Sequence, residues 1–208
     1  LGIGVGLLDD ERCCSIAMVS NGLIKAATKN ARHNVNIMEK TVEKTGAPIV
    51  GASSTCIMTM RDEYPHLLGI DNSRVRDSLD LATKFIFKKI SEGKKLNFRK
   101  DFHARIAYHT PCHLERLGWE YFSIELLKMI PGVELTVLES NCCGIAGTYG
   151  FKKENYEVSQ AIGRPLFEQI AAVGPDFVAC DCETCKWQIE MSTGVSVKHP
   201  VSVLAEAI

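Results

Sequence analysis

Apolar positions in the C-terminal half of the chain form short buried runs, separated by stretches with a helical period. Four of these runs predict strands: ARIAYH (104–109), VELTVLE (133–139), DFVACD (176–181) and VSVKH (195–199). Apolar residues spaced three and four apart predict the helices between and after them: 121–130, 161–173, one opening at CETCKWQIEM (182–191), and one from about Val201. Strands that alternate with helices imply an α/β fold with a mostly parallel sheet.

The N-terminal half repeats the same order of elements. Cys13-Cys14 and Cys142-Cys143 are both CC pairs, and the offset between their residue numbers (142 − 13 = 129) also puts SSTC (53–56) on CETC (182–185). NVNIMEKTVEKTGAPIVGA (34–52) then aligns without a gap with GRPLFEQIAAVGPDFVACD (163–181). Because the order of helix, Gly/Pro break and strand is shared, internal duplication explains the pattern better than chance.

Two tandem homologous βα repeats are therefore expected, each with a small, mostly parallel sheet flanked by helices. We call residues 1–96 the first repeat and residues 97–208 the second, joined by the charged linker EGKKLNFRKD (92–101). In the first repeat, GIGVGLLDD (2–10) is predicted to be the strand that enters the CC turn. A long amphipathic helix is predicted from Ser73, its N-cap, to about Ser91.

Composition and charge limit the classes of protein to which this chain can belong. The net charge of −1 gives no basic field, so no nucleic-acid partner is expected. No uncharged apolar run approaches the 18 or so residues that span a bilayer. Leu1 falls inside a predicted strand rather than a secretory signal, which suggests a fragment of a longer chain. Nine cysteines, an odd number in CC, CxC and CxxC clusters, favour metal or redox chemistry in the cytoplasm over extracellular disulfides.

Five cysteines of the second repeat follow predicted strand ends: Cys112, Cys142, Cys143, Cys182 and Cys185. The carboxyl ends of parallel strands line one edge of a sheet, so these thiols are expected to converge. Five thiols exceed the four ligands of a structural zinc ion, whereas iron–sulfur clusters can use them. Gly144 would let the backbone approach a bulky cluster. Cys180 has no cysteine counterpart in the first repeat and is interpreted as a packing residue.

The pattern of Cys112, CCG at 142–144 and CETC at 182–185 resembles the cysteine-rich CCG domain family of the heterodisulfide reductase B subunits, whose domains commonly occur in tandem. The stretches HTPCHL, NCCGIAGTYGFKKENY and CDCETCKWQIEMST are similar to the C subunits of anaerobic glycerol-3-phosphate dehydrogenases, without their ferredoxin-like region. The intervals that separate the CC pair from Cys112 and from Cys182 lie slightly outside the family's usual gaps.

The resemblance implies a non-catalytic electron-transfer subunit with a [4Fe–4S] cluster on the five cysteines, and with Gly144 beside it. It also implies a flavoprotein dehydrogenase partner, a membrane-associated subunit, quinone as a possible electron acceptor, and a cytoplasmic position on the inner face of the membrane. The first repeat departs from the pattern, with Ser15 for the glycine and Ser53 for a cysteine. It is either a degenerate scaffold, which we favour, or a weaker metal site.

Two other functions remain open on the residues alone. A zinc-stabilised interaction module would use four of the five thiols. A thiol–disulfide oxidoreductase would use Cys182 and Cys185 at a helix start. His109 and His113 flank Cys112 and could hydrogen-bond to a cluster sulfur. The favoured interpretation is that they are polar residues at a strand end, satisfied by the backbone.

Overall fold

The computed structural model describes all 208 residues. The first repeat contains, in chain order, α1 (Ile16–Ser20), α2 (Ile24–Thr45), β1 (Ile49–Gly51), α3 (Ser54–Met58), the π-helical turn η1 (Thr59–Glu63), α4 (Tyr64–Leu68), the 3₁₀ turn η2 (Arg76–Ser78), β2 (Leu79–Leu81) and α5 (Ala82–Ser91).

The second repeat contains β3 (Ala104–Tyr108), α6 (Cys112–Leu117), α7 (Glu120–Lys128), β4 (Val133–Val137), the 3₁₀ turns η3 (Tyr149–Phe151) and η4 (Lys153–Asn155), α8 (Tyr156–Val173), β5 (Phe177–Ala179), α9 (Glu183–Thr193), β6 (Val197–Lys198) and α10 (Pro200–Glu206).

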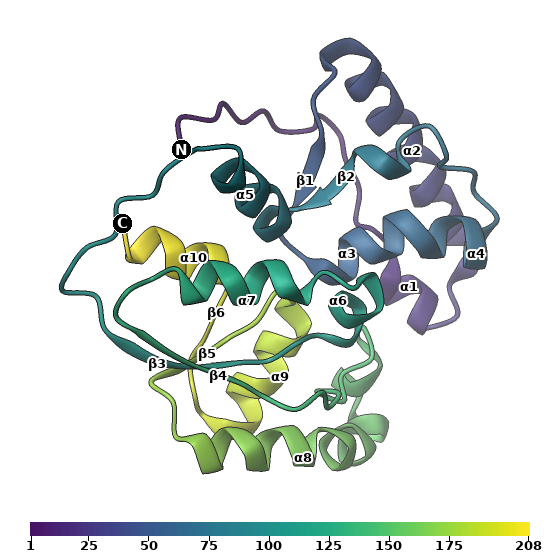
Figure 1. Cartoon of the computed structure of the whole chain (residues 1–208). Helices are drawn as coiled ribbons and strands as arrows, with labels where there is room; N and C mark the ends of the chain where they lie inside the picture. Colours follow the sequence, from purple (N-terminus) through teal and green to yellow (C-terminus); the bar gives the residue numbers. More distant parts are fainter.

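The second repeat is a parallel sheet between two layers of helices (Figure 1). Its strands lie in the order β4-β3-β5-β6 and every pairing is parallel. Ile106 and Tyr108 pack in the core cluster that contains residues of α7 and α10. Ala107, between them, packs in the cluster that contains residues of α8 and α9. Successive side chains therefore point to opposite covered faces, which confirms the predicted α/β class.

The first repeat has a shorter sheet of two parallel strands, β1 and β2. Its own core joins α2 to α4, with Ala27, Met38 and Tyr64 among the buried residues. Ile57 and Leu81 of the first repeat instead belong to the same cluster as Ile106 of the second. The two repeats thus share one core cluster, and the division at residue 96 stays a prediction.

The internal duplication extends beyond the cysteines, with one change of register. Strand β1 corresponds to β5 at the offset of 129, since Ile49 falls on Val178. α3 and η1 correspond to α9 at the same offset, and the insertion that follows them, containing α4 and η2, shortens the offset to 118. Leu79 of β2 therefore falls on Val197 of β6 (197 − 79 = 118).

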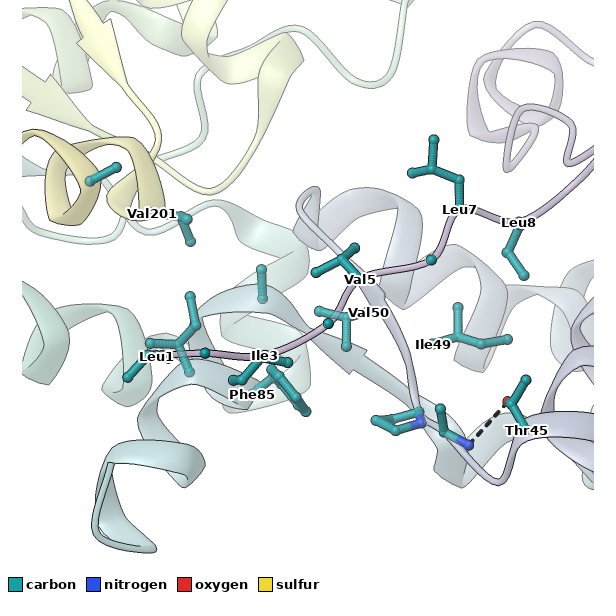
Figure 2. Close-up of a pocket in the computed structure, with 18 of the residues that line it drawn as sticks. Leu1, Ile3, Val5, Leu7, Leu8, Thr45, Ile49, Val50, Phe85 and Val201 are labelled. Atoms are coloured by element: carbon teal, nitrogen blue, oxygen red, sulfur yellow. Dashed lines mark hydrogen bonds between the residues drawn. The ribbon is translucent and has the colours of Figure 1, made fainter. Parts of the chain in front are cut away.

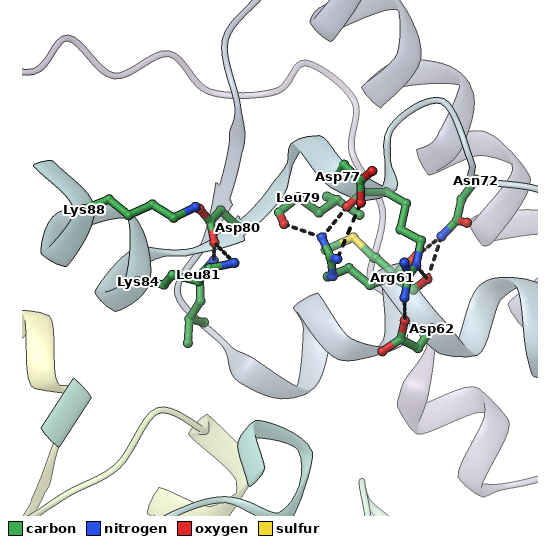
Figure 3. Close-up of polar contacts among 11 residues, drawn as sticks. Arg61, Asp62, Asn72, Asp77, Leu79, Asp80, Leu81, Lys84 and Lys88 are labelled. Atoms are coloured by element: carbon green, nitrogen blue, oxygen red, sulfur yellow. Dashed lines mark hydrogen bonds and ion pairs between the residues drawn. The ribbon is translucent and has the colours of Figure 1, made fainter. Parts of the chain in front are cut away.

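The predicted helix from Ser73 to Ser91 is wrong in its first half: residues 76–78 form η2, β2 follows, and the helix begins only at Ala82. Figure 3 shows the contacts that hold this segment extended. The Arg61 guanidinium donates to the Leu79 carbonyl at 2.8 Å. The parallel pairing of β2 with β1 also holds it extended. The amphipathic pattern that predicted a helix carries no information about either contact.

The predicted strand over 2–10 is also wrong, since these residues form no strand. Its counterpart β4 pairs only with β3, and the offset places the equivalent of β3 at numbers below 1. An apolar groove of about 910 Å³ lies between this segment, β1, α5 and α10 (Figure 2). A strand without a neighbour lacks the hydrogen bonds that define it.

The linker forms no helix or strand beyond residue 92, as expected, but Leu96 and Phe98 pack on the shared core. The remaining predicted strands and helices of the second repeat are confirmed, with ends that differ by a few residues. None of the helices is both long enough and apolar enough to span a lipid bilayer.

Candidate metal centre

The five predicted cysteines of the second repeat meet at the carboxyl edge of the sheet. Cys112 is the first residue of α6, after β3, and Cys142 and Cys143 lie in the loop after β4. Cys182 is the N-cap of α9, after β5, and Cys185 lies in the first turn of that helix. Three short loops from parallel strands thus bring together thiols that are far apart along the chain, as the topology predicts.

One direct sulfur contact and several electrostatic interactions connect the five side chains. Cys143 Sγ lies 3.1 Å from Cys185 Sγ. Cys142 interacts with the thiols of Cys112 and Cys143, and Cys182 interacts with Cys185. Cys143, Cys182 and Cys185 are buried, whereas Cys112 and Cys142 are exposed. This group of five cysteines is therefore buried on one side and reaches the protein surface on the other.

These contacts separate the acidities of the thiols. The pKa of Cys142 is lowered to about 2, first because the Cys112 thiol donates to it and then because Cys143 does. The pKa of Cys182 is lowered to about 5, mainly by the Cys185 thiol, with help from the Thr184 and Thr55 hydroxyls. The pKa of Cys112 is raised by the same contact with Cys142. Thiolates are therefore held in place by neutral thiols, whose protons a metal cation would displace.

Gly144 is required by packing inside the protein. Its φ of +89° is in the left-handed region, and a Cβ there would overlap the Ser159 carbonyl oxygen of α8. Its N–H donates to Cys142 Sγ at 3.3 Å. The glycine thus allows the CC turn to close against α8, which is a different reason from the close approach of a cluster that the sequence suggested; a contact with a cofactor stays a prediction.

His109 and Cys180 form the buried wall of the site. The ligand atoms of His109, Cys180 and Cys185 all lie within 4.8 Å of one another. His109 is 1% exposed, neither ring nitrogen has a hydrogen-bond partner, and burial lowers the pKa of the imidazole to about 4. Cys180 is buried in the core cluster that contains residues of α8 and α9, as expected for a packing residue, and its thiol also lies beside His109 and Cys185.

The cysteines of the first repeat form a second, smaller group. Cys14 interacts with both Cys13 and Cys56, and the Cys14 thiol lowers the pKa of Cys13 to about 5. Ser15 has a φ of +77° and its N–H donates to Cys13 Sγ at 3.4 Å. The turn seen at Gly144 is thus kept here without the glycine.

The two cysteine groups are joined through α3. Thr55 Oγ1 lies 3.1 Å from Cys182 Sγ and 2.9 Å from His113 Nδ1. The Ser54 backbone N–H donates to the Asp181 carbonyl at 2.9 Å. His113 is therefore satisfied by Thr55. Sequence reasoning missed Thr55 because only the folded chain brings the repeats together.

Asp181 supports the loop that carries Cys182. Its fully buried carboxylate accepts hydrogen bonds from Tyr108, Ser123 and Thr83, at 2.7, 2.9 and 3.2 Å. Burial raises the pKa of this carboxyl. The donors come from β3, α7 and α5, so both repeats hold one end of the cysteine loop.

The donor set suits a thiophilic metal centre. The second repeat brings six sulfurs and one unpartnered imidazole to the same edge of the sheet, more donors than the four ligands of a single zinc ion. Soft thiolates select zinc, copper(I) or iron–sulfur clusters, and clusters can distribute several thiolates over several irons. The residues present therefore fit an iron–sulfur group.

Comparisons with known proteins agree with this geometry. The sequence profile of the family described as "Cysteine-rich domain" (CCG) matches residues 1–61 and 106–190. The ends of the two matches differ by the offset of the internal repeat (190 − 61 = 129). The first match is the shorter, because it begins at Leu1 and lacks the part of the domain that precedes the CC turn in the second.

Three relatives illustrate the range of the family. The chain is 52% identical over 208 residues, its whole length, to the C subunit of anaerobic glycerol-3-phosphate dehydrogenase of Escherichia coli K12, and covers 52% of that protein. It is 27% identical over 200 residues (92% of the chain, 36% of the relative) to the B subunit of fumarate reductase (CoM/CoB) of Methanothermobacter marburgensis. It is 25% identical over 220 residues (all of the chain, 41% of the relative) to an uncharacterized iron–sulfur protein of Methanocaldococcus jannaschii.

The chain thus spans about half the length of the E. coli relative. The family match covers well over half of this chain, in two copies that coincide with the two cysteine groups. This protein belongs to the cysteine-rich CCG domain family.

Proposed function

We propose that this chain is the electron-transfer part of an iron–sulfur subunit and that it holds a [4Fe–4S] cluster on Cys112, Cys142, Cys143, Cys182 and Cys185. The observation that carries the proposal is that these five cysteines follow strands β3, β4 and β5 at one edge of the sheet. One relative of the chain is described as an iron–sulfur protein. Such a cluster supplies one-electron redox chemistry when bound.

The chain's own residues would set the conditions for that chemistry. Cys143, Cys182 and Cys185 are buried and exclude water from one side. Cys112 and Cys142 are exposed, which gives an electron donor or acceptor a short approach to the centre. Asp181 and Thr55 hold the Cys182 loop from behind. We propose no catalytic step on an organic substrate for the residues of this site.

The partners follow from the relative that this chain matches over its whole length. Since 52% of the residues are identical to a subunit of anaerobic glycerol-3-phosphate dehydrogenase, we propose that electrons arrive from a flavoprotein subunit that oxidises glycerol 3-phosphate. They would leave towards quinone through a membrane-associated subunit. The chain would then act at the inner face of the cell membrane through these partners.

Metal analysis of anaerobically purified protein tests the proposal. We expect a brown protein with about four irons and four acid-labile sulfides for the second-repeat site. Cys112→Ala should lose most of this iron, because it removes a ligand. Cys13→Ala, at an exposed cysteine of the first repeat, is the matched control and should keep it.

Two results would contradict the proposal. One zinc ion with no sulfide and no visible absorbance would identify a zinc-stabilised module. Disulfide exchange activity that survives Cys112→Ala but not Cys182→Ala, in protein that stays colourless after reconstitution, would identify a dithiol enzyme.

A further inference from the structure

His109 is an unusual buried residue in this chain. Of the buried side chains with a polar atom lacking a partner, it alone has two such atoms, Nδ1 and Nε2. Buried polar groups are normally hydrogen-bonded, and an orphaned one costs about 1–3 kcal/mol. An imidazole with two unpaired nitrogens therefore indicates that a further group supplies its hydrogen-bond partner.

The surroundings of His109 indicate the chemistry of that hydrogen-bond partner. The sulfurs of Cys180 and Cys185 lie with the imidazole in a set spanning no more than 4.8 Å, and Cys142 is close enough to act on its charge. A neutral imidazole has one N–H donor and one acceptor. Thiolate and sulfide sulfurs in the cluster are anionic acceptors, and the chain already has enough thiolates to serve as ligands.

We propose that His109 donates an N–H hydrogen bond to a sulfur on the buried side of the bound cluster and so raises its reduction potential. This inference rests on the proposed function and names a residue outside the cysteine pattern. Reduction adds negative charge to the cluster, and a donor aimed at its sulfur stabilises the reduced form more than the oxidised form. His109 is thus a positioning and tuning residue, without a step of its own.

Redox titration of the anaerobic protein tests this inference. His109→Phe keeps a planar ring in the buried site but has no N–H, so its midpoint potential should be lower than that of the unchanged protein at equal iron and sulfide content. His109→Asn and His109→Gln carry an amide N–H near the positions of Nδ1 and Nε2. One of the two should restore part of the potential and so identify the donating nitrogen.

A spectroscopic signature accompanies the potential. In protein with ¹⁵N-labelled histidine, pulsed electron paramagnetic resonance of the reduced cluster should show a weak nitrogen coupling that His109→Phe removes. His66→Phe, at an exposed histidine of α4, should leave both the coupling and the potential unchanged.

The outcomes separate the two proposals. An unchanged potential in His109→Phe at full iron content would overturn the role of His109 and leave the proposed function standing. Protein without iron would overturn the proposed function and this inference together. If His109→Phe does not fold, His109→Leu serves as the variant without an N–H: a potential equal to that of the unchanged protein at full iron content would also overturn it.

The groove beside β1 supports a second inference, independent of any metal. In the second repeat β5 lies between β3 and β6, and the backbone N–H of His109 donates to the Ala179 carbonyl at 3.0 Å. In the first repeat β1 has only β2, and Val50, the equivalent of Ala179, faces the apolar groove in Figure 2. The first family match also lacks the part of the domain that contains β3 in the second.

We infer that a parallel strand, equivalent to β3, binds in this groove between Val50 and the segment 4–8. Its occupant is a segment of the longer polypeptide, since the chain spans about half the length of the E. coli relative. In the second repeat, α6 follows β3 and begins at Cys112, so the equivalent helix of the first repeat would reach Cys13 and Cys14. A cavity of about 430 Å³ lies beside these two cysteines and shares lining residues with the groove. The first sheet would then have the four-strand order of the second.

Amide hydrogen exchange tests the added strand. We expect the Val50 amide to exchange rapidly in the 208-residue chain and slowly in the full-length polypeptide, because a new ladder would protect it. The amide of Ala179, which is the equivalent of Val50 and lies beside β3 in the second sheet, is the matched control and should be slow in both. Rapid exchange at Val50 in the full-length protein would overturn the inference.

Discussion

Gly144 holds the CC turn through one backbone angle and one close contact. Its φ of +89° and the overlap that a Cβ would make with the backbone of α8 exclude any side chain. Glycine next to two cysteines was visible in the sequence, and so was its counterpart Ser15. The reason for the glycine was not, because Ser159 is distant along the chain and meets Gly144 only once α8 has packed against the turn.

Gly144→Ala is expected to destabilise the protein by about 2–5 kcal/mol. About 1–2 kcal/mol comes from a side chain in the left-handed region, and about 1–3 kcal/mol comes from overpacking against the α8 backbone. Urea unfolding of the metal-free protein measures the change in the free energy of unfolding.

Gly174→Ala is the control for the cost of placing a side chain in the left-handed region. Gly174 also has a positive φ, of +57°, but a Cβ there meets nothing within 4 Å. It should lose only about 1–2 kcal/mol. Equal losses at the two glycines would show that the contact with Ser159 contributes nothing.

At the scale of elements, β2 and α5 show why the predicted helix from Ser73 to Ser91 is wrong in its first half. Asp80, which falls inside that predicted helix, lies buried in β2 (Figure 3). Its carboxylate pairs with Lys84 at 3.1 Å and Lys88 at 2.9 Å, both on α5. Spacings of four and eight residues suit one helix, and they equally suit a strand residue that lies just before the helix.

Lys84 joins two elements from different repeats. Its ammonium group lies 3.4 Å from the centroid of the Trp119 ring, just before α7, while it pairs with Asp80. We expect Lys84→Met to lower the free energy of unfolding by about 1–3 kcal/mol, because it removes a cation–π contact and a largely buried ion pair. Thermal or urea unfolding would measure the loss.

Lys88→Met gives the matched comparison. The Lys88 side chain is 49% exposed and contacts the same carboxylate. Its loss should cost less than about 1 kcal/mol, because exposed ion pairs contribute little. If the two substitutions cost the same, Trp119 does not strengthen the Lys84 interaction.

At the scale of the whole molecule, the two repeats share a core cluster, and we expect them to unfold together. Ile57 and Leu81 of the first repeat pack with Ile106 and Leu126 of the second. Trp187 lies in the second repeat against Phe151, whereas Trp119 also contacts Lys84 and Arg61 of the first repeat. In a Trp119→Phe background the remaining tryptophan fluorescence therefore reports on the second repeat.

Met38→Ala tests this cooperativity by destabilising the first repeat. Met38 is 1% exposed and packs only with first-repeat residues. Its truncation should cost about 2–5 kcal/mol, and the tryptophan transition should shift together with the circular dichroism. A tryptophan transition that stays in place while the dichroism shows a separate early step would indicate two independent domains.

The sequence by itself determined the class of the fold, the duplication and the meeting of five cysteines. Periodicity follows from local backbone geometry, and parallel strands bring their carboxyl ends to one edge whatever their distance along the chain. Only the tertiary structure decided the inward position of His109 and Cys180, the contact of Thr55 with Cys182, and the extended conformation of β2. Each of these depends on a partner from another element or the other repeat, and local patterns carry no information about that partner.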